Sequence, residues 1–186
     1  MGLTLASRSP QRRAILEQLG VPFTVRPSDV DEVDDGPPEA VAQENALRKA
    51  LAAAGASGEV VLGVDTIVAT ELEVWGKPPN VEAARETLRR LAGRTHRVVS
   101  GVAVVEEHAV VHAFTATTQV TFRELDDDLL EWYLRSGEWE GRAGGYAVQG
   151  RGAVLVERLE GDYLNVVGLP AAALLKAWPE LLSVAA

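Results

Sequence analysis

Three arginines crowd the predicted start of the first helix, which opens at Ser9-Pro10. They are Arg8, Arg12 and Arg13. A helix N-terminus already carries about half a positive charge, so arginine is unfavourable there unless an anion binds. Free backbone N–H groups and guanidinium groups both suit phosphate. Arg12 also lies on the same helical face as the apolar residues at i+3, i+4 and i+7, so we expect it to point inward. The cluster is therefore either a phosphate site or a set of arginines paired with nearby acids.

A carboxylate follows the most apolar stretch of the chain. Residues 60–64 are continuously apolar, as in a central strand, and Asp65 and Thr66 come directly after them. The carboxyl end of such a strand is where open α/β sheets bind ligands. Asp65 is therefore a candidate general base or metal ligand, and the alternative is a turn aspartate.

Several further residues allow two interpretations. Lys77, in a Gly-Lys-Pro loop, is either a fixed phosphate contact or a surface lysine. Glu32 belongs to an acidic stretch, residues 29–35, of the kind that is usually only solvated. Gln149 ends a glycine-rich segment in which the backbone can approach a ligand closely, and its amide can read a base edge. Lys49 lies opposite the apolar face of its predicted helix, so periodicity alone makes it a solvated lysine.

Alternating helices and strands must position these residues, which predicts an α/β protein. Apolar periodicity and turn residues predict strands at residues 3–6, 23–26, 60–64, 67–70, 97–105, 109–121 and 154–159. Caps and 3.6-residue periodicity predict helices at residues 10–19, 39–54, 81–91, 127–135 and 170–178. We find no repeat or linker, so we expect one domain over residues 1–186.

The composition excludes several classes of protein. The 186 residues carry 18 basic and 27 acidic side chains, and the net charge of −9 argues against nucleic-acid or anionic-membrane binding. The absence of cysteine excludes disulfides and thiolate metal sites, so a bound metal would use carboxylate, histidine, backbone or water ligands. No apolar run reaches the roughly 18 residues of a membrane span, and the first residues do not form a signal peptide. We therefore expect a cytoplasmic protein.

Taken together, the motifs resemble the Maf family of nucleoside triphosphate pyrophosphatases. The matching stretches are LASRSP (residues 5–10), VDE (30–32), ALRKA (46–50), LGVDT (62–66), GKP (76–78), LAGRTH (91–96), AGGYAVQG (143–150), GDY (161–163) and VGLP (167–170). They run in order along the whole chain, which makes the resemblance specific.

The resemblance implies a fold and a reaction. The fold is an elongated, two-lobed α/β protein with a curved mixed sheet and a central cleft, related to the inosine-triphosphate pyrophosphatases. The reaction converts a nucleoside triphosphate and water to the monophosphate and pyrophosphate with a divalent cation, Mg²⁺ in the simplest case, with Mn²⁺ or Co²⁺ as alternatives. A homodimer is a further expectation from the family.

The resemblance also assigns roles to residues. Asp65 matches the family's proton acceptor and Glu32 a nearby acid, and both would hold the metal. Lys77 joins them in catalysis. Polar and basic residues of the substrate cleft match Ser7, Arg12, Lys49 and Lys77, with Arg13 beside them.

One motif also implies a preference among bases. The segment Tyr-Ala-Val-Gln-Gly is similar to that of the branch acting on dTTP and UTP, where the base is read at positions matching Gln11, Thr66 and Gln149. Gln11 departs from the arginine that usually follows the proline, and Arg12 or Arg13 would substitute for it.

Three other functions remain open at this stage. The first is a nucleotide-sensing regulator of septum formation with little turnover, because sensing needs the same binding groups. The second is a pyrophosphatase of 7-methyl-GTP or another purine triphosphate. The third is a phosphatase that removes the γ-phosphate. Product analysis distinguishes all three from a dTTP/UTP pyrophosphatase.

Overall fold

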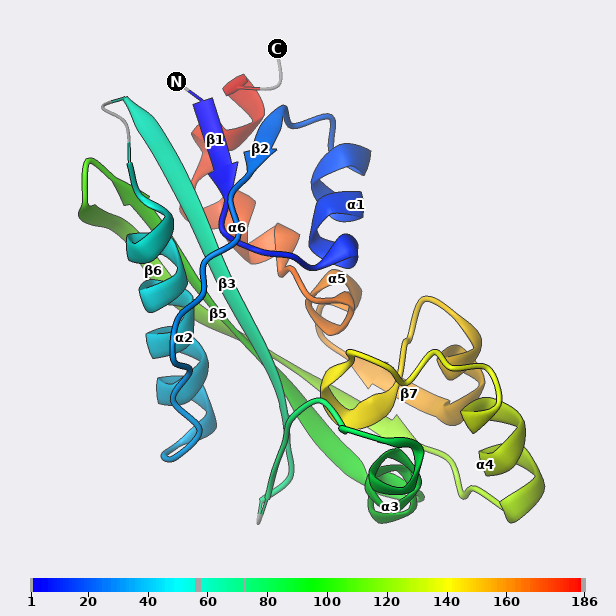
Figure 1. Ribbon diagram of the computed structural model, residues 1–186. Coiled ribbons are helices and arrows are strands. Elements are labelled where there is room, and N and C mark those ends of the chain that lie inside the picture. The colour runs from blue at the N-terminus through cyan, green and yellow to red at the C-terminus, as the bar shows by residue number, and fades with distance from the viewer. Residues whose placement is uncertain (1, 56–57, 72, 185–186) are drawn as a thin grey trace. The chain divides into compact units, whose positions relative to one another are not determined.

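The strands form one mixed sheet, as the sequence predicts. The computed structural model describes residues 2–55, 58–71 and 73–184 (Figure 1). Its seven strands follow the order β2-β1-β3-β5-β6-β7, and β4 pairs with β3. They are β1 (Gly2–Leu5), β2 (Phe23–Val25), β3 (Glu59–Ala69), β4 (Val74–Trp75), β5 (Thr95–Glu106), β6 (Ala109–Phe122) and β7 (Val156–Glu160). The helices are α1 (Pro10–Gln18), α2 (Pro38–Ala53), α3 (Val81–Leu91), α4 (Asp127–Leu134), α5 (Tyr163–Val167) and α6 (Ala171–Ala177), with 3₁₀ turns η1 (Ala143–Gly145), η2 (Arg151–Leu155) and η3 (Pro179–Val184).

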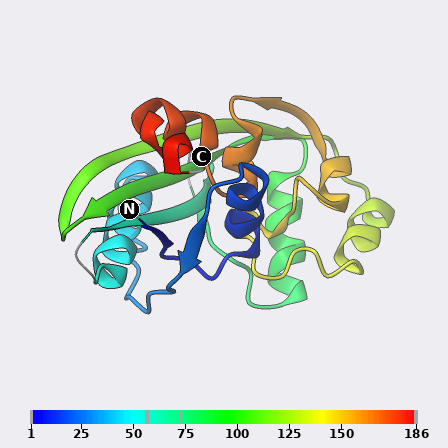
Figure 2. The ribbon, with the colours of Figure 1, turned by 90° about the horizontal axis from the view of Figure 1, so that it is seen from above.

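The chain divides into two compact units. The first comprises residues 1–66, 100–116 and 168–186, and the second comprises residues 67–99 and 117–167. In the first unit, β1 pairs in parallel with both β2 and β3, and Leu3 lies opposite Phe23 on one side and Val60 on the other. Figure 2 shows α2 and α6 on opposite sides of these strands, which explains why the strand residues of β3 are buried on both faces. The single domain of residues 1–186 stays a prediction.

Helix α2 packs unusually closely on the strands of the first unit. A Cβ atom added at Gly63 of β3 would overlap the backbone oxygen of Ala46, and one added at Gly101 of β5 would overlap that of Ala42. Only glycine therefore allows this approach, and α2 faces the sheet with small residues. Periodicity predicts one apolar face of this helix with Leu47, Ala50, Leu51 and Ala54, and we expect Leu51 to be buried there, but it is 38% exposed. That prediction was wrong because close backbone packing selects alanine rather than leucine.

Strand β3 does not end where the sequence predicts. It continues through Asp65 and Thr66 to Ala69, so these residues lie within the strand rather than in a turn after it. The polar pair interrupts the apolar run without ending the strand, because β3 is bonded to β1 at its first part and to β4 at Val68 and Ala69. A strand position holds the Asp65 side chain more rigidly than a turn would.

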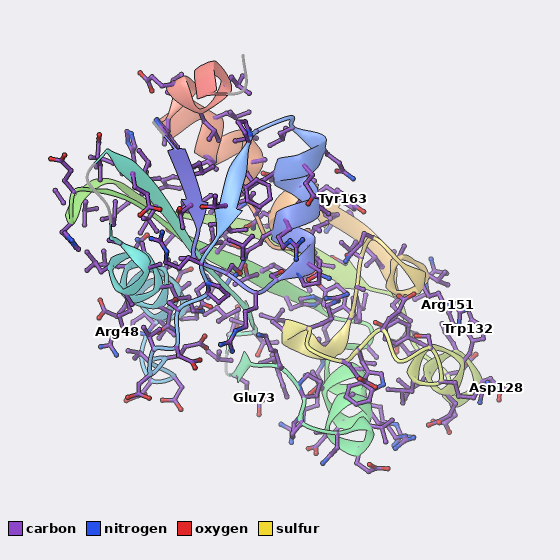
Figure 3. All side chains as sticks on the ribbon, turned by 45° about the horizontal axis from the view of Figure 1, so that its top comes forward. Arg48, Glu73, Asp128, Trp132, Arg151 and Tyr163 are labelled. Carbon is purple, nitrogen blue, oxygen red and sulfur yellow. The ribbon has the colours of Figure 1, made fainter. Side chains whose placement is uncertain are left out.

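The second unit has its own hydrophobic core. It comprises Val68, Ala84, Leu88, Leu91, Val98, Val120, Phe122, Leu130, Tyr133, Leu134, Tyr146, Val148 and Leu155. The amphipathic pattern of α4 predicts both Trp132 and Tyr133 in the core. Tyr133 is fully buried, but Trp132 is 38% exposed. Its ring instead stacks under the Arg151 guanidinium, 5.8 Å from the ring centroid (Figure 3).

Some short elements differ from the prediction. Residues 151–155 form η2, so β7 begins at Val156 rather than at residue 154. The single-turn helix α5 and the turn η3 were not predicted, because elements of five or six residues are too short to show a hydrophobic period. Across the described part of the chain, none of the helices is both long and apolar enough to span a membrane.

His96 is buried at the centre of the second unit. Its Nε2 lies 2.9 Å from the Tyr146 hydroxyl, and its ring packs edge-on against Phe122 and Tyr146. Its Nδ1 is buried without a hydrogen-bond partner among the described residues. Burial lowers the pKa of His96 from 6.5 to about 4, because a charged imidazole would lose its hydration. The ring is therefore neutral over the physiological range.

This low pKa predicts an acid-sensitive stability. As the pH falls, the unfolded chain binds a proton at about 6.5 before the folded protein does. Neutral His96 therefore makes its full contribution to the free energy of unfolding above pH 6.5. Between pH 6.5 and about 4 this contribution falls by up to about 1.4 kcal/mol per pH unit. We expect His96→Gln, which cannot titrate, to flatten the fall in unfolding free energy between pH 6.5 and 5, measured by urea denaturation. The exposed His108→Asn is the control, and an unchanged slope in His96→Gln would contradict the assignment.

Candidate active site

The centre of the candidate site is a lysine held between two carboxylates in the first unit. Lys49 Nζ lies 2.6 Å from Glu32 Oε1 and 2.6 Å from Asp65 Oδ1. The Lys49 and Asp65 side chains are only 12% and 10% exposed, whereas that of Glu32 is 56% exposed. Lys49 is thus not the solvated lysine that periodicity predicts. Because α2 buries a face rich in alanine, position 49 lies close enough to β3 for its ammonium to reach Asp65.

Helix α2 holds the acidic loop with one of its faces. Asn45, Arg48 and Lys49 occupy positions i, i+3 and i+4, so their side chains are neighbours. Arg48 donates to the Asp31 carbonyl (3.1 Å), and Asn45 bonds to the backbone of Val33. The loop of residues 31–33 is therefore ordered by specific bonds, although it contains neither helix nor strand.

The second group of the site surrounds the guanidinium of Arg12. Ser9 caps α1, accepting from the Arg12 backbone N–H, and so sets the direction of the helix. The three nitrogens of Arg12 then donate to three different partners: Nε to the Gly168 carbonyl (2.9 Å), Nη1 to Ser7 Oγ (3.0 Å) and Nη2 to Thr66 Oγ1 (3.1 Å). The inward orientation predicted from periodicity is confirmed.

These partners are all neutral, which determines the electrostatics of Arg12. Desolvation lowers the pKa of its guanidinium, and the negative charges of Asp65 and Glu32 act in the opposite direction from further away. A guanidinium remains protonated even so, because its ordinary pKa exceeds 12. Among the residues that the structure describes, the Arg12 cation is therefore hydrogen-bonded but not ion-paired, which suits an anionic ligand.

Two buried residues extend the site beyond those that the sequence indicated. Ser100 on β5 is fully buried, and its hydroxyl lies 2.9 Å from Thr66 Oγ1. Asn45 is 2% exposed and donates to Asp65 Oδ2 at 3.2 Å. The only sequence signal for either is a polar residue in an otherwise apolar or alanine-rich stretch.

The other residues near the start of α1 behave differently. Gln11 Oε1 accepts from the Ser9 hydroxyl at 3.0 Å, so this side chain folds back onto the helix cap. Arg8 and Asp29 form an exposed ion pair at 3.5 Å, which is the simple acid pairing that the sequence allowed. Arg13 is exposed. Of the three arginines, Arg12 is the one whose guanidinium is held by several hydrogen bonds beside Thr66.

Lys77 and Gln149 belong to the second unit, and both are exposed. The segments that carry them lie side by side, because the Gly144 N–H donates to the Gly76 carbonyl at 3.1 Å. Gly144 and Gly145 have φ angles of 68° and 70°, which favour glycine. Tyr146, which follows them, is anchored by its bond to His96. The two motifs thus form one surface of this unit.

The donor set fits a divalent cation in its chemistry. Mg²⁺ takes hard oxygen ligands and is usually held by one or two carboxylates, with substrate phosphates and water completing its shell. Glu32 and Asp65 supply such carboxylates on either side of Lys49. Within the described residues there is no cluster of three or more acidic or histidine side chains that could hold a metal unaided.

Comparison with known proteins agrees with these motifs. A family model described as Maf-like protein matches residues 2–181. A dTTP/UTP pyrophosphatase of Moorella thermoacetica is 51% identical over 175 residues, which cover 90% of this chain and 89% of that protein. A dTTP/UTP pyrophosphatase of Pyrococcus furiosus is 42% identical over 177 residues, which cover 94% and 92%.

A solved structure, the nucleoside-triphosphatase or dITP/XTP pyrophosphatase of Mycobacterium abscessus, is 18% identical with a TM-score of 0.44, over 67% of this chain and 76% of that one. The family assignment rests on the sequence matches, which extend over nearly the whole chain. The protein therefore belongs to the Maf family.

Proposed function

We propose that this protein is a nucleoside triphosphate pyrophosphatase that converts dTTP and UTP to the monophosphate and pyrophosphate. The observation that supports it most is the Lys49 ammonium held between Glu32 and Asp65. This arrangement puts a fixed, nearly buried carboxylate beside a cation in a family whose relatives include dTTP/UTP pyrophosphatases. A protein that only bound nucleotides would not need such a carboxylate.

The phosphates are bound by cations of the chain. An ammonium has three N–H donors, and two of those of Lys49 point to carboxylates, so the third can meet a phosphate oxygen. Arg12 adds a guanidinium whose present partners are neutral. Lys77 contributes a third cation from its loop. These charges offset part of the repulsion between a triphosphate and a protein of net charge −9.

Asp65 orients and deprotonates the attacking water. The water oxygen forms a bond to the α-phosphorus while its proton passes to the Asp65 carboxylate. The bond from the α-phosphorus to the oxygen bridging to the β-phosphate breaks, and pyrophosphate leaves with that oxygen. Lys49 holds Asp65 Oδ1 and Asn45 holds Oδ2, so the carboxylate presents a fixed orientation.

Glu32 and Asp65 are the residues that would hold a divalent cation, Mg²⁺ in the simplest case. When bound, such a cation stabilises the negative charge that develops on the phosphate oxygens. We further propose that the enzyme acts in the cytoplasm and that it is a homodimer. Size-exclusion chromatography with light scattering tests the oligomeric state.

The decisive experiment is product analysis. The purified protein is incubated with Mg²⁺ and dTTP, UTP, CTP, GTP, 7-methyl-GTP or ITP, and pyrophosphate and orthophosphate are assayed separately. We expect pyrophosphate from dTTP and UTP. Orthophosphate alone would indicate a γ-phosphatase, and pyrophosphate from purines would overturn only the base preference. Tight nucleotide binding without any product would favour a nucleotide-sensing regulator.

Gln149 is the proposed reader of the pyrimidine base, together with Thr66. An amide can donate to or accept from the uracil edge, which differs from cytosine in both respects. We expect Gln149→Ala to reduce the ratio of kcat/KM for UTP over CTP by about tenfold, the value of one lost discriminating hydrogen bond. Steady-state kinetics on both substrates measure this. An unchanged ratio would mean that the base is read elsewhere, and Gln119→Ala, an exposed glutamine on β6 of the same unit, is the control.

A further inference from the structure

We propose that Asn45 is a positioning residue that fixes Glu32 and Asp65 relative to each other. The inference rests on the proposed pyrophosphatase function and names a residue that the motifs did not indicate. Asn45 lies on α2, four residues before Lys49, and is almost completely buried. A buried amide in an alanine-rich helix face requires an explanation, because an unpaired one would be destabilising.

The contacts of Asn45 supply that explanation. Its Oδ1 accepts from the Val33 N–H (2.7 Å), and its Nδ2 donates both to the Val33 carbonyl (2.9 Å) and to Asp65 Oδ2 (3.2 Å). The amide thus bonds to both backbone polar groups of Val33, as a neighbouring strand would. Its remaining N–H reaches the carboxylate. One side chain joins the acidic loop to the proposed base.

These bonds determine where Glu32 lies. Val33 is the residue after Glu32, so fixing both backbone polar groups of Val33 restricts the Glu32 Cα to one place. Lys49 then meets the Glu32 carboxylate at 2.6 Å. The loop of residues 26–36 has neither helix nor strand of its own. Asn45 therefore gives this loop the backbone hydrogen bonds that a neighbouring β-strand would otherwise provide.

The helix that carries Asn45 is itself fixed. Gly63 and Gly101 let the α2 backbone lie against β3 and β5 at the turns that include Ala42 and Ala46. Asn45 lies within these turns, and Asp65 is two residues beyond Gly63 on the same strand. The distance between the amide and the carboxylate is therefore set by backbone packing rather than by flexible side chains.

The first experiment measures kinetics with Mg²⁺ and dTTP. We expect Asn45→Ala to lower kcat about 10- to 100-fold, the effect of misplacing a reacting group by about 1 Å, with little change in KM. The matched control is Gln43→Ala. Gln43 is an amide on the same helix, and it donates to the Val102 carbonyl at 3.0 Å instead of to the acidic loop. We expect this variant to keep the wild-type kcat.

A double-mutant cycle separates positioning from a general structural role. If Asn45 acts by placing Glu32 relative to Asp65, then Asn45→Ala lowers kcat by a clearly smaller factor in a Glu32→Gln background than in the wild type, because residues that act as a unit are non-additive. The loss that remains reflects the bond from Asn45 to Asp65. If Asn45 only supports the fold, the two losses multiply. Multiplying losses, or a wild-type kcat in Asn45→Ala, would overturn the proposal.

A second measurement does not depend on activity, and its first part uses the wild-type protein alone. In the wild-type protein, we expect the Val33 amide to exchange with solvent at least about tenfold more slowly than the Asp34 and Asp35 amides, because it is hydrogen-bonded. In Asn45→Ala this protection is lost, while the amides of β3 keep theirs. An unprotected Val33 amide in the wild type would refute the proposed role of the Asn45–Val33 hydrogen bonds. The absence of pyrophosphate release by the wild type would refute the proposed function alone.

Discussion

Replacement of Asp65 by asparagine is expected to lower kcat for pyrophosphate release by about 10²- to 10⁴-fold, the usual contribution of one positioned base. Asparagine has the same shape but cannot accept the proton of water. The variant also removes one of the two carboxylates beside Lys49. We therefore expect dTTP without a divalent cation to bind at least as tightly as before, since one negative charge facing the triphosphate is gone. Turnover assays and calorimetric titration measure the two effects separately.

The structure also indicates how Asp65→Asn will affect stability. With its oxygen toward Lys49, the new amide NH₂ would face the donor Nδ2 of Asn45, where the carboxylate now accepts. We expect a modest loss of thermal stability with the fold retained. The control is Asp127→Asn, which neutralises an exposed carboxylate paired with Arg89 at 2.8 Å. A near-normal kcat in Asp65→Asn would contradict the assignment of Asp65 as the base.

The sequence predicted the elements of the fold better than it predicted their faces. The apolar run before Asp65 indicated a central strand, and the helix starts predicted at residues 10, 81 and 127 coincide with those of α1, α3 and α4, which Ser9, Asn80 and Asp126 cap. The predicted apolar face of α2 was wrong at Leu51, because hydrophobic periodicity counts leucine more heavily than alanine, whereas Ala50 is buried and Leu47 and Ala54 pack against the core. The close approach of α2 to the sheet depends on Gly63 and Gly101. Both glycines are distant from α2 in the sequence, so the periodicity of the helix alone carries no information about them.

The same limit applies to the candidate site. Motif resemblance indicated Asp65, Glu32 and Lys49 individually, and the structure brings these three together. It could not indicate Asn45 or Ser100, because their roles arise from bonds to Val33 and Thr66 rather than from any local pattern. A polar residue within an apolar or alanine-rich stretch is the only sign of such a partner in the sequence.

Arg12 is the residue whose replacement should weaken substrate binding most. Its guanidinium directs three nitrogens to Gly168, Ser7 and Thr66, an arrangement that lysine cannot reproduce with one nitrogen. We expect Arg12→Lys to lower kcat/KM for dTTP by about 10- to 100-fold, chiefly through KM, since a hydrogen bond to a charged group contributes about 1.5–3 kcal/mol. Arg12→Met, which also removes the charge, should lose more. Steady-state kinetics distinguish the two variants.

Thermal stability provides an independent test of the same assignment. In the unliganded protein, desolvation lowers the pKa of Arg12 and its bonded partners are neutral, so its charge adds little to stability. These hydrogen bonds to neutral groups do not balance the charge, so the electrostatic energy of the guanidinium is gained chiefly when an anion binds. We therefore expect Arg12→Met to change the Tm without nucleotide only slightly and to abolish most of the increase in Tm that dTTP produces. Arg89→Met, at an exposed ion pair, should leave that increase intact. If Arg12→Met lowers the unliganded Tm severely but keeps the nucleotide-induced increase, then Arg12 is a structural residue and the phosphates are bound by other groups.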